Sequence, residues 1–174
     1  MSEKHLNPIF GRRSCRHFLS EPLREGDLEL LLEAMRQAPS AGNRQPWFIY
    51  VVTNRAIKER LAQAAFDQSF LVQAPVVFVV CAEPERSAAR YRDRGRNLYC
   101  LQDTAAMVEN LLIAATALGY GSCWIGAFDE EAARAVLNIP RRLRPVAIVP
   151  IGPGIRSEHP PARRPLSEIT TFVQ

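Results

Sequence analysis

The sequence predicts one compact domain that contains both helices and strands. Three runs rich in β-branched residues predict strands at residues 47–53, 76–81 and 146–149. The first two runs lack the polar alternation of a half-exposed strand, so both are expected to be buried. Residues 101–118 are apolar nearly all round, which indicates a central buried helix. The 174 residues of the chain suffice for one such domain with a substantial core.

Three shorter helices are also expected. The first opens near Asp27 and stops at Pro39, because its apolar residues repeat with the spacing of one helix face. The second covers about residues 57–65, and the third follows a capping residue, Asp129, and ends near Leu137. The apolar face of the first helix consists of Leu28, Leu31, Leu32 and Met35.

The composition excludes several classes of protein. With 47% hydrophobic and 23% charged residues, the chain has the make-up of a globular protein. The net charge is +4, but no segment gathers positive residues beside stacking aromatics, so no nucleic-acid partner is expected. The longest strongly apolar run, residues 74–82, is too short to cross a membrane, and the N-terminus lacks the apolar core of a signal sequence. We therefore expect a soluble, cytoplasmic protein.

Neither disulfides nor a metal centre are expected. The four cysteines are scattered without a C-x-x-C pair, and three of them stand among apolar residues, which favours small buried side chains. The three histidines have no spacing that would pair them with another histidine or with a cysteine around a metal ion. The cysteines are Cys15, Cys81, Cys100 and Cys123.

The end of the chain, about residues 153–174, is expected to form an extended arm. It is too rich in proline and arginine to fold on itself, yet it carries apolar side chains that need cover. An arm that wraps a second subunit resolves this conflict, which predicts a homodimer. The apolar side chains are Leu166, Ile169, Phe172 and Val173.

Residues 12–16 (Arg-Arg-Ser-Cys-Arg) carry the first candidate binding group. In an extended backbone, Arg12, Ser14 and Arg16 point to the same side. Two guanidinium groups and a hydroxyl on one face suit a phosphate or another anion, although a solvated basic segment has the same composition.

Two further segments have groups that suit a ligand. In residues 40–47, Gly42 permits close backbone approach, and Asn43 and Gln45 offer donors and acceptors; a polar helix-to-strand connection is the alternative. Residues 119–128 place glycines before and after an apolar stretch, so their backbone N–H groups can donate to a heterocycle. Neither segment has the spacing of a Rossmann fingerprint or a P-loop.

Together with Arg163-Arg164 near the C-terminus, these segments resemble the FMN-dependent nitroreductase family. Any one match can arise by chance, but five in the family's order over nearly the whole chain are specific. The matching pieces are RRSCRHF (12–18), PSAGNRQPWFIYVV (39–52), APVVFVVCA (74–82), RGRNLYCLQDTAAMVENLLIAATALGYGSCWIGAFDEE (94–131) and RRPLSEI (163–169).

The resemblance implies an α+β sandwich in which helices surround a mixed β-sheet. It also implies one FMN-binding domain over residues 1–174, and an intertwined homodimer whose extended C-terminal arm reaches the partner subunit. Two FMN sites would lie at the subunit interface. The implied reaction takes electrons from NADH or NADPH and delivers them through the flavin to a small electron-poor molecule, such as a nitroaromatic or a quinone.

The resemblance assigns the flavin phosphate and ribityl chain to Arg12 and Ser14, with Arg13 beside them. At the C-terminus Arg163 is the better match to a second phosphate ligand, and Arg164 is the alternative. Arg16 corresponds to a cation near the pyrimidine edge of the ring, where it would tune the flavin; no residue is expected to act as an acid or base.

The partner subunit is expected to supply a loop to the same flavin. That loop corresponds to Ser40, Asn43 and Gln45. The segment that covers the redox edge of the ring corresponds to Trp124, Ile125, Gly126 and Ala127.

The substrate lid is the main departure from the larger family members, which often insert helices between the second strand and the central helix. Here that connection, residues 82–100, is short and polar and is typical of a solvated loop or helix face. Tyr91 and Tyr99 either stack over the substrate or pack within the protein. Other flavin chemistry therefore stays open, namely reductive dehalogenation, dehydrogenation or flavin breakdown, as does a non-enzymatic flavin-binding module.

Overall fold

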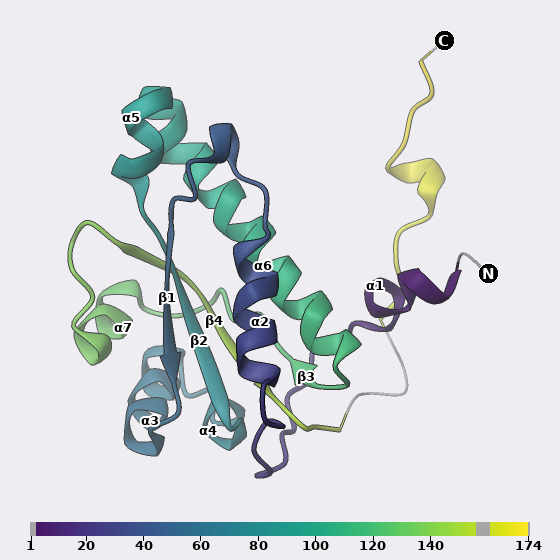
Figure 1. Cartoon of the computed structure of the whole chain (residues 1–174), viewed down its shortest axis with the longest axis vertical. Helices are drawn as coiled ribbons and strands as arrows, with labels where there is room; N and C mark the ends of the chain where they lie inside the picture. Colours follow the sequence, from purple (N-terminus) through teal and green to yellow (C-terminus); the bar gives the residue numbers. More distant parts are fainter. Residues whose placement is uncertain (1–2, 156–160, 174) are drawn as a thin grey trace.

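The computed structural model describes residues 3–155 and 161–173, and its centre is a four-stranded antiparallel sheet in the order β1-β2-β4-β3. The α+β class is as predicted (Figure 1). The sheet differs from the expected mixed one, because its strands pair antiparallel and the parallel pairing in these residues is an isolated bridge between Ser14 and Ser122. The strands are β1 (Trp47–Val52), β2 (Val76–Ala82), β3 (Gly121–Ser122) and β4 (Arg144–Gly152).

The predicted helices are confirmed as α2, α3, α6 and α7. Asp129 caps α7 as expected, since its carboxylate accepts hydrogen bonds from the N–H groups of Glu131 and Ala132, both at 2.9 Å. Helices α1 and α4 are too short to show a periodic pattern. The helices are α1 (Asn7–Gly11), α2 (Asp27–Arg36), α3 (Arg55–Ala64), α4 (Phe70–Gln73), α5 (Pro84–Arg94), α6 (Cys100–Ala117) and α7 (Glu130–Leu137). The shorter turns are η1 (Glu3–Leu6), η2 (Ala41–Asn43), the π-helical η3 (Gly95–Tyr99) and η4 (Leu166–Glu168).

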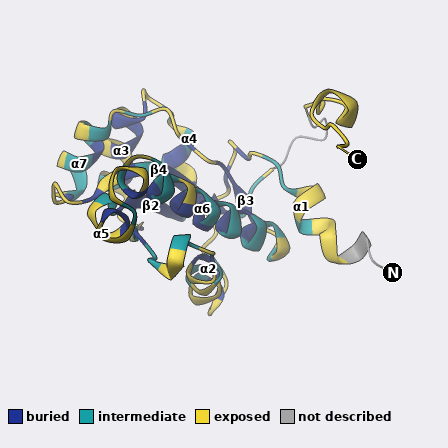
Figure 2. Ribbon diagram, turned by 90° about the horizontal axis from the view of Figure 1, so that it is seen from above, coloured by how far each residue is buried: buried dark blue, intermediate teal, exposed yellow. Residues whose placement is uncertain are grey.

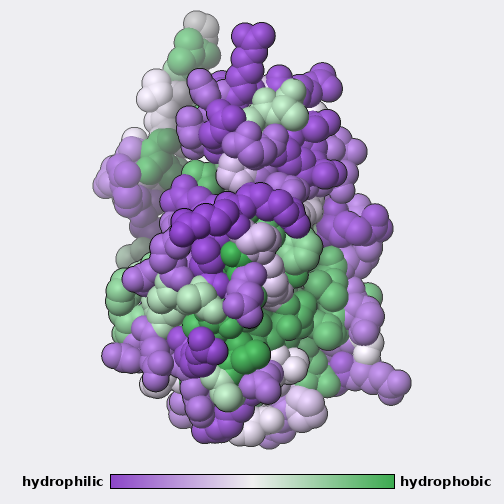
Figure 3. All heavy atoms as spheres, turned by 90° about the vertical axis from the view of Figure 1, so that its left-hand side faces the viewer, coloured by the Kyte–Doolittle hydropathy of each residue, from purple (hydrophilic) through white to green (hydrophobic). Residues whose placement is uncertain are grey.

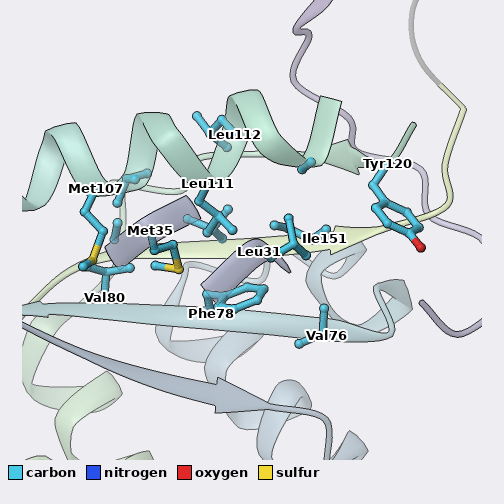
Figure 4. Packing of buried hydrophobic residues seen from close by; sticks show 14 of the residues in the cluster. Leu31, Met35, Val76, Phe78, Val80, Met107, Leu111, Leu112, Tyr120 and Ile151 are labelled. Carbon is cyan, nitrogen blue, oxygen red and sulfur yellow. The ribbon is translucent and has the colours of Figure 1, made fainter. Parts of the chain in front are cut away.

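Strand β2 lies at the centre of the core and is buried on both faces. Val76, Phe78 and Val80 point to the layer formed by α2 and α6, where they meet leucines and methionines of both helices (Figure 4). The intervening residues belong to the second layer, with α3, α4 and α7. Two covered faces explain the continuous apolar run of this strand. Figure 2 shows the buried strands between the two layers.

Strand β1 was predicted to be buried, but most of its residues are not. It pairs only with β2 and forms the edge of the sheet, so Phe48 and Val51 remain 44% and 39% exposed. An edge strand can carry the same apolar sequence as a central one, because the pattern does not reveal how many neighbours it has. Apolar residues also gather in one region of the surface seen in Figure 3.

Tyr120 anchors the segment that follows α6. Its hydroxyl donates a hydrogen bond to the Asp27 carboxylate and accepts one from the backbone N–H of Arg24, 2.9 Å away. The Tyr120 hydroxyl, and then the Arg24 guanidinium, hold the pKa of Asp27 below its ordinary value. The start of residues 119–128 is thereby fixed against α2.

Helix α1 and residues 161–173 extend away from the sheet at one end of the molecule (Figure 1). Both carry apolar side chains with little cover, among them Phe10 at 61% and Phe172 at 91% exposure. Within residues 3–155 and 161–173, no helix is both long and apolar enough to span a membrane.

Candidate functional site

Residues 12–16 run as an extended segment beside the end of the sheet. The N–H of Cys15 donates to the carbonyl oxygen of Ser122 at 2.8 Å, next to the parallel bridge between Ser14 and Ser122. Cys15 is buried while Ser14 and Arg16 on either side are exposed, as the predicted alternation requires. The serine hydroxyl and the Arg16 guanidinium therefore face away from the core.

Two glycines make room for the buried Cys15. A Cβ atom at Gly121 or at Gly154 would lie 2.7 Å from the Cys15 sulfur. The thiol also donates to the carbonyl oxygens of His17 and Ile155, at 3.3 and 3.4 Å. The packing of Cys15 between these two glycines anchors residues 12–16 to β3 and to the chain after β4. Gly121 and Gly154 are the sequence signal for this packing.

The arginines of the two chain ends meet in one pocket. Arg12, Arg13 and Arg163 line a cavity of about 350 Å³, together with Ile9, Phe10 and Pro161. The Arg12 Nε atom is also 4.0 Å from the carboxylate of Glu109 on α6. Positive charge from residues far apart in the sequence is thus concentrated at this pocket.

The neighbouring arginines Arg13 and Arg164 have other partners. Arg13 donates through Nη1 to the carbonyl oxygens of Phe10 and Arg12, at 2.6 and 2.7 Å, near the end of α1. Arg164 donates to the Glu168 carboxylate at 3.1 Å, so its charge is neutralised within the arm. The geometry favours Arg163 over Arg164 at the pocket.

Residues 124–127 are joined to β4 at Ile125. The backbone of Ile125 exchanges hydrogen bonds with Ile148, at 2.9 and 3.0 Å, so Ile125 is buried and its own N–H is used. In the described part of the chain, no group accepts from the N–H of Gly126 or Ala127, and both residues are exposed. These two N–H groups can donate to a ligand.

Trp124 borders a second cavity, of about 260 Å³, between α6 and β4. The lining is largely apolar, and the ion pair between Glu130 and Arg144, at 2.8 Å, is also part of it. The lining residues of α6 are Leu101, Thr104, Ala105 and Val108.

The loop of residues 40–45 is held by side chains and has an unusual backbone. The Ser40 hydroxyl accepts from the N–H of Gln45 at 3.0 Å, and the Gln45 amide donates to the Asn43 side-chain oxygen at 3.2 Å. Gly42, Asn43 and Gln45 have φ angles of 55°, 54° and 49°. Non-glycine residues in this region are strained, and such strain is concentrated at functional sites.

Asp103 attaches this loop to α6. Its carboxylate accepts a hydrogen bond from the N–H of Ala41 at 3.0 Å, whereas the N-cap residue of α6 is Tyr99. The buried carboxylate therefore joins α6 to a loop that lies 62 positions away in the sequence. Its second oxygen is buried and has no partner among the described residues.

One chain does not bring the loop together with the other candidate residues. Asp103 holds the loop near the start of α6, whereas Gly11 lies against Thr116 near the end of the helix. Thirteen positions of α6 separate them, about 20 Å along the axis. Asp103 is also about 200° around the helix from Leu101 and Ala105, which line the Trp124 cavity.

A model of the nitroreductase family matches residues 9–70 and 65–153. The chain belongs to the nitroreductase family. It is 36% identical over 154 residues to an Archaeoglobus fulgidus protein provisionally named NADH dehydrogenase/NAD(P)H nitroreductase, covering 86% of this chain and 85% of the relative. It is 28% identical over 170 residues to a Bacillus subtilis protein named FMN reductase (NAD(P)H), covering 90% and 68% of the two chains.

The crystal structure of nitroreductase A from Vibrio parahaemolyticus superimposes with a TM-score of 0.88 at 26% identity, covering 97% of this chain and 76% of that chain. The family assignment from the sequence and the nitroreductase fold are therefore both confirmed.

The role of Asp103 can be tested by substitution. Burial raises the pKa of Asp103 above its ordinary value, although the Ala41 N–H acts in the opposite direction. A carboxyl whose pKa is raised on folding destabilises the fold when charged, so the wild-type protein gains stability as the pH falls. We predict that, as the pH is lowered from about 7 to about 4, the free energy of unfolding of the wild-type protein rises relative to that of Asp103→Asn.

Urea unfolding of the wild-type protein, Asp103→Asn and Asp103→Ala measures this. The asparagine keeps an acceptor for the Ala41 N–H, so the alanine variant should be about 1 kcal/mol less stable than the asparagine variant. Equal stability of the two variants, or an unchanged difference between wild type and Asp103→Asn across the pH range, would contradict this role.

Proposed function

We propose that this protein is an FMN-dependent oxidoreductase that uses NADH or NADPH to reduce electron-poor acceptors such as nitroaromatics or quinones. The observation that carries the proposal is the pocket in which Arg12, Arg13 and Arg163 meet. Family membership and the names of the relatives, which include an FMN reductase and an NAD(P)H nitroreductase, support the same assignment.

The pocket suits the phosphate of FMN in charge and position. Arg12 and Arg163 offer charge-assisted hydrogen bonds, which are stronger than neutral ones and match phosphate geometry. Ser14 is exposed two positions after Arg12, so its hydroxyl can bind the ribityl chain next to the phosphate. Arg13, whose guanidinium is partly engaged by carbonyl groups, would contribute mainly charge.

The flavin ring would lie near residues 124–127. FMN, when bound, supplies hydride acceptance from a reduced nicotinamide and transfer to the acceptor. The N–H groups of Gly126 and Ala127 are available to bind its redox edge. The exposed Arg16 guanidinium would stabilise the negative charge that reduction places on the pyrimidine side, more than it stabilises the neutral ring.

Cys123, which directly precedes Trp124, does not offer a nucleophile. Cys123 is buried, and burial raises the pKa of its thiol although Arg16 and Ser14 act in the opposite direction. A thiol in this state stays protonated at neutral pH, so the proposed chemistry does not use it.

We also propose that two chains complete each site, as a homodimer. In its own chain the loop of Ser40, Asn43 and Gln45 joins α6 at Asp103, whereas Arg12 faces Glu109. Glu109 lies about 9 Å further along the helix and about 120° around it, so we expect the loop not to contact the arginine pocket of the same chain. Helix α1 and the arm after residue 161 present apolar side chains that a second subunit would cover. The same contact would bring a partner's loop to the flavin.

The direct test is an absorbance spectrum of the purified protein, followed by anaerobic addition of NADPH or NADH. We expect a flavin spectrum that either nucleotide bleaches and that a nitroaromatic or quinone restores. Colourless protein that does not take up FMN at saturating concentration would overturn the proposal. Flavin that nicotinamides fail to reduce would instead favour a non-enzymatic flavin-binding module.

The arginine pocket predicts a difference between neighbouring residues. Arg12→Gln and Arg163→Gln should each weaken FMN binding on the order of tenfold or more, because each removes a charge-assisted bond to phosphate. Arg164→Gln is the matched control, since Arg164 pairs with Glu168, and its FMN affinity should be unchanged.

Fluorescence titration of the flavin-free protein with FMN and with riboflavin measures these affinities. Riboflavin lacks the phosphate, so its binding should respond little to Arg12→Gln and Arg163→Gln. An Arg164→Gln variant as weak as Arg163→Gln, or equal losses for both flavins, would contradict the phosphate assignment.

A further inference from the structure

Two arginines and two tyrosines stack on one another where α5 folds back on η3. The rings of Tyr91 and Tyr99 meet edge to face with centroids 5.2 Å apart. The Arg90 guanidinium lies over Tyr91 at 5.6 Å, and that of Arg94 lies over Tyr99 at 5.2 Å. Arg94 also donates through Nε to the Tyr99 hydroxyl at 2.9 Å. We refer to these four residues as the arginine–tyrosine cluster.

The cluster borders the loop of residues 40–45. A Cβ atom on Gly42 would collide with the Tyr91 hydroxyl and would lie 3.4 Å from Cδ of Arg90. Reciprocal hydrogen bonds join Arg44 to Arg86, with each Nε donating to the other residue's carbonyl oxygen, at 3.2 and 2.7 Å. Any flavin that the loop contacts would therefore lie close to the cluster.

The positive charge of the cluster is not neutralised. Among the described residues, no carboxylate lies within ion-pair distance of Arg90 or Arg94, and both are exposed. Two other arginines of this stretch face carboxylates: Arg96 pairs with Glu85 at 2.8 Å and with Asp93 at 2.7 Å, and Arg86 lies 4.0 Å from Glu83. The acidic residues of this stretch therefore pair with arginines outside the cluster.

The backbone that presents the cluster is strained. Arg92 has φ 50° and ψ −136° inside α5, a region that non-glycine residues rarely adopt. The π-helical turn η3 follows, and a Cβ on Gly95 would lie 2.6 Å from the carbonyl oxygen of Ser87. Such turns are frequent at functional sites. The close approach of η3 to α5 is what places Tyr99 against Tyr91.

We propose that the arginine–tyrosine cluster selects electron acceptors that carry a carboxylate or sulfonate group on a planar aromatic ring. The guanidinium groups bind the anion, while the tyrosine rings offer an aromatic surface to its ring. This inference rests on the proposed function. In the proposed homodimer the loop of residues 40–45 contacts the partner subunit's flavin, and the cluster that borders this loop would then lie beside that flavin.

The test compares two acceptors that differ in charge, 4-nitrobenzoate and the neutral 4-nitrobenzamide. We expect the FMN-loaded wild-type protein to have the higher kcat/KM for 4-nitrobenzoate. In Arg90→Gln/Arg94→Gln, kcat/KM for 4-nitrobenzoate should fall on the order of tenfold or more, and that for 4-nitrobenzamide should change little. The matched control is Arg60→Gln on α3, at the opposite end of the molecule, which should keep the wild-type preference (Figure 1).

A second readout does not depend on turnover. Benzoate cannot be reduced, so its Kd can be measured from its perturbation of the flavin absorbance. We expect the double variant to raise that Kd on the order of tenfold while its Kd for FMN stays at the wild-type value.

Equal kcat/KM for both acceptors in the wild-type protein would overturn the inference, as would equal losses for both in the double variant. A lower ratio of NADPH to NADH activity, with an unchanged acceptor preference, would also overturn it and would assign the arginines to the nucleotide phosphate. Failure of the wild-type protein to bind FMN would overturn the proposed function instead.

Discussion

The position of α6 constrains the rest of the candidate site. Its buried face packs on β2 and on α2, where the amide of Asn110 donates to the Ala34 carbonyl oxygen at 3.0 Å. Near its start, Asp103 holds the loop of residues 40–45, and further along its length Glu109 faces Arg12. One rigid helix therefore separates the loop from the arginine pocket. In the proposed homodimer, a second copy of the chain would bring its loop to the arginine pocket.

Much of this architecture could be predicted from local patterns. The apolar spacing of α2, the capping Asp129 and the continuous run of β2 reflect contacts within a few residues or burial on both faces. The exposure of β1 could not be predicted in this way, because the edge position depends on strand order. The positive φ angles of Gln45 and Arg92 also have no signature in the residue types, whereas asparagine, as at Asn43, is enriched in this region.

In the candidate site, too, local sequence patterns predict some features, while others depend on contacts between distant residues. The alternation of residues 12–16 follows from an extended backbone, and the structure shows it around the buried Cys15. The choice between Arg163 and Arg164 depends on which one the Glu168 carboxylate pairs with, and adjacent arginines do not reveal this in the sequence. The contact between Asp103 and Ala41 depends on packing across 62 positions, so neither residue reveals it in the sequence.

Subunit complementation tests the two-chain site most directly. One chain would carry Arg12→Gln with Arg163→Gln, and the other Asn43→Ala with Gln45→Ala, so that neither homodimer retains an intact site. Co-expressed heterodimers purified with two different affinity tags should bind one FMN per dimer, because one site combines the unchanged arginines of the second chain with the unchanged loop of the first. Heterodimers that bind no more FMN than either parent, or a monomer that binds FMN with full affinity, would contradict this account.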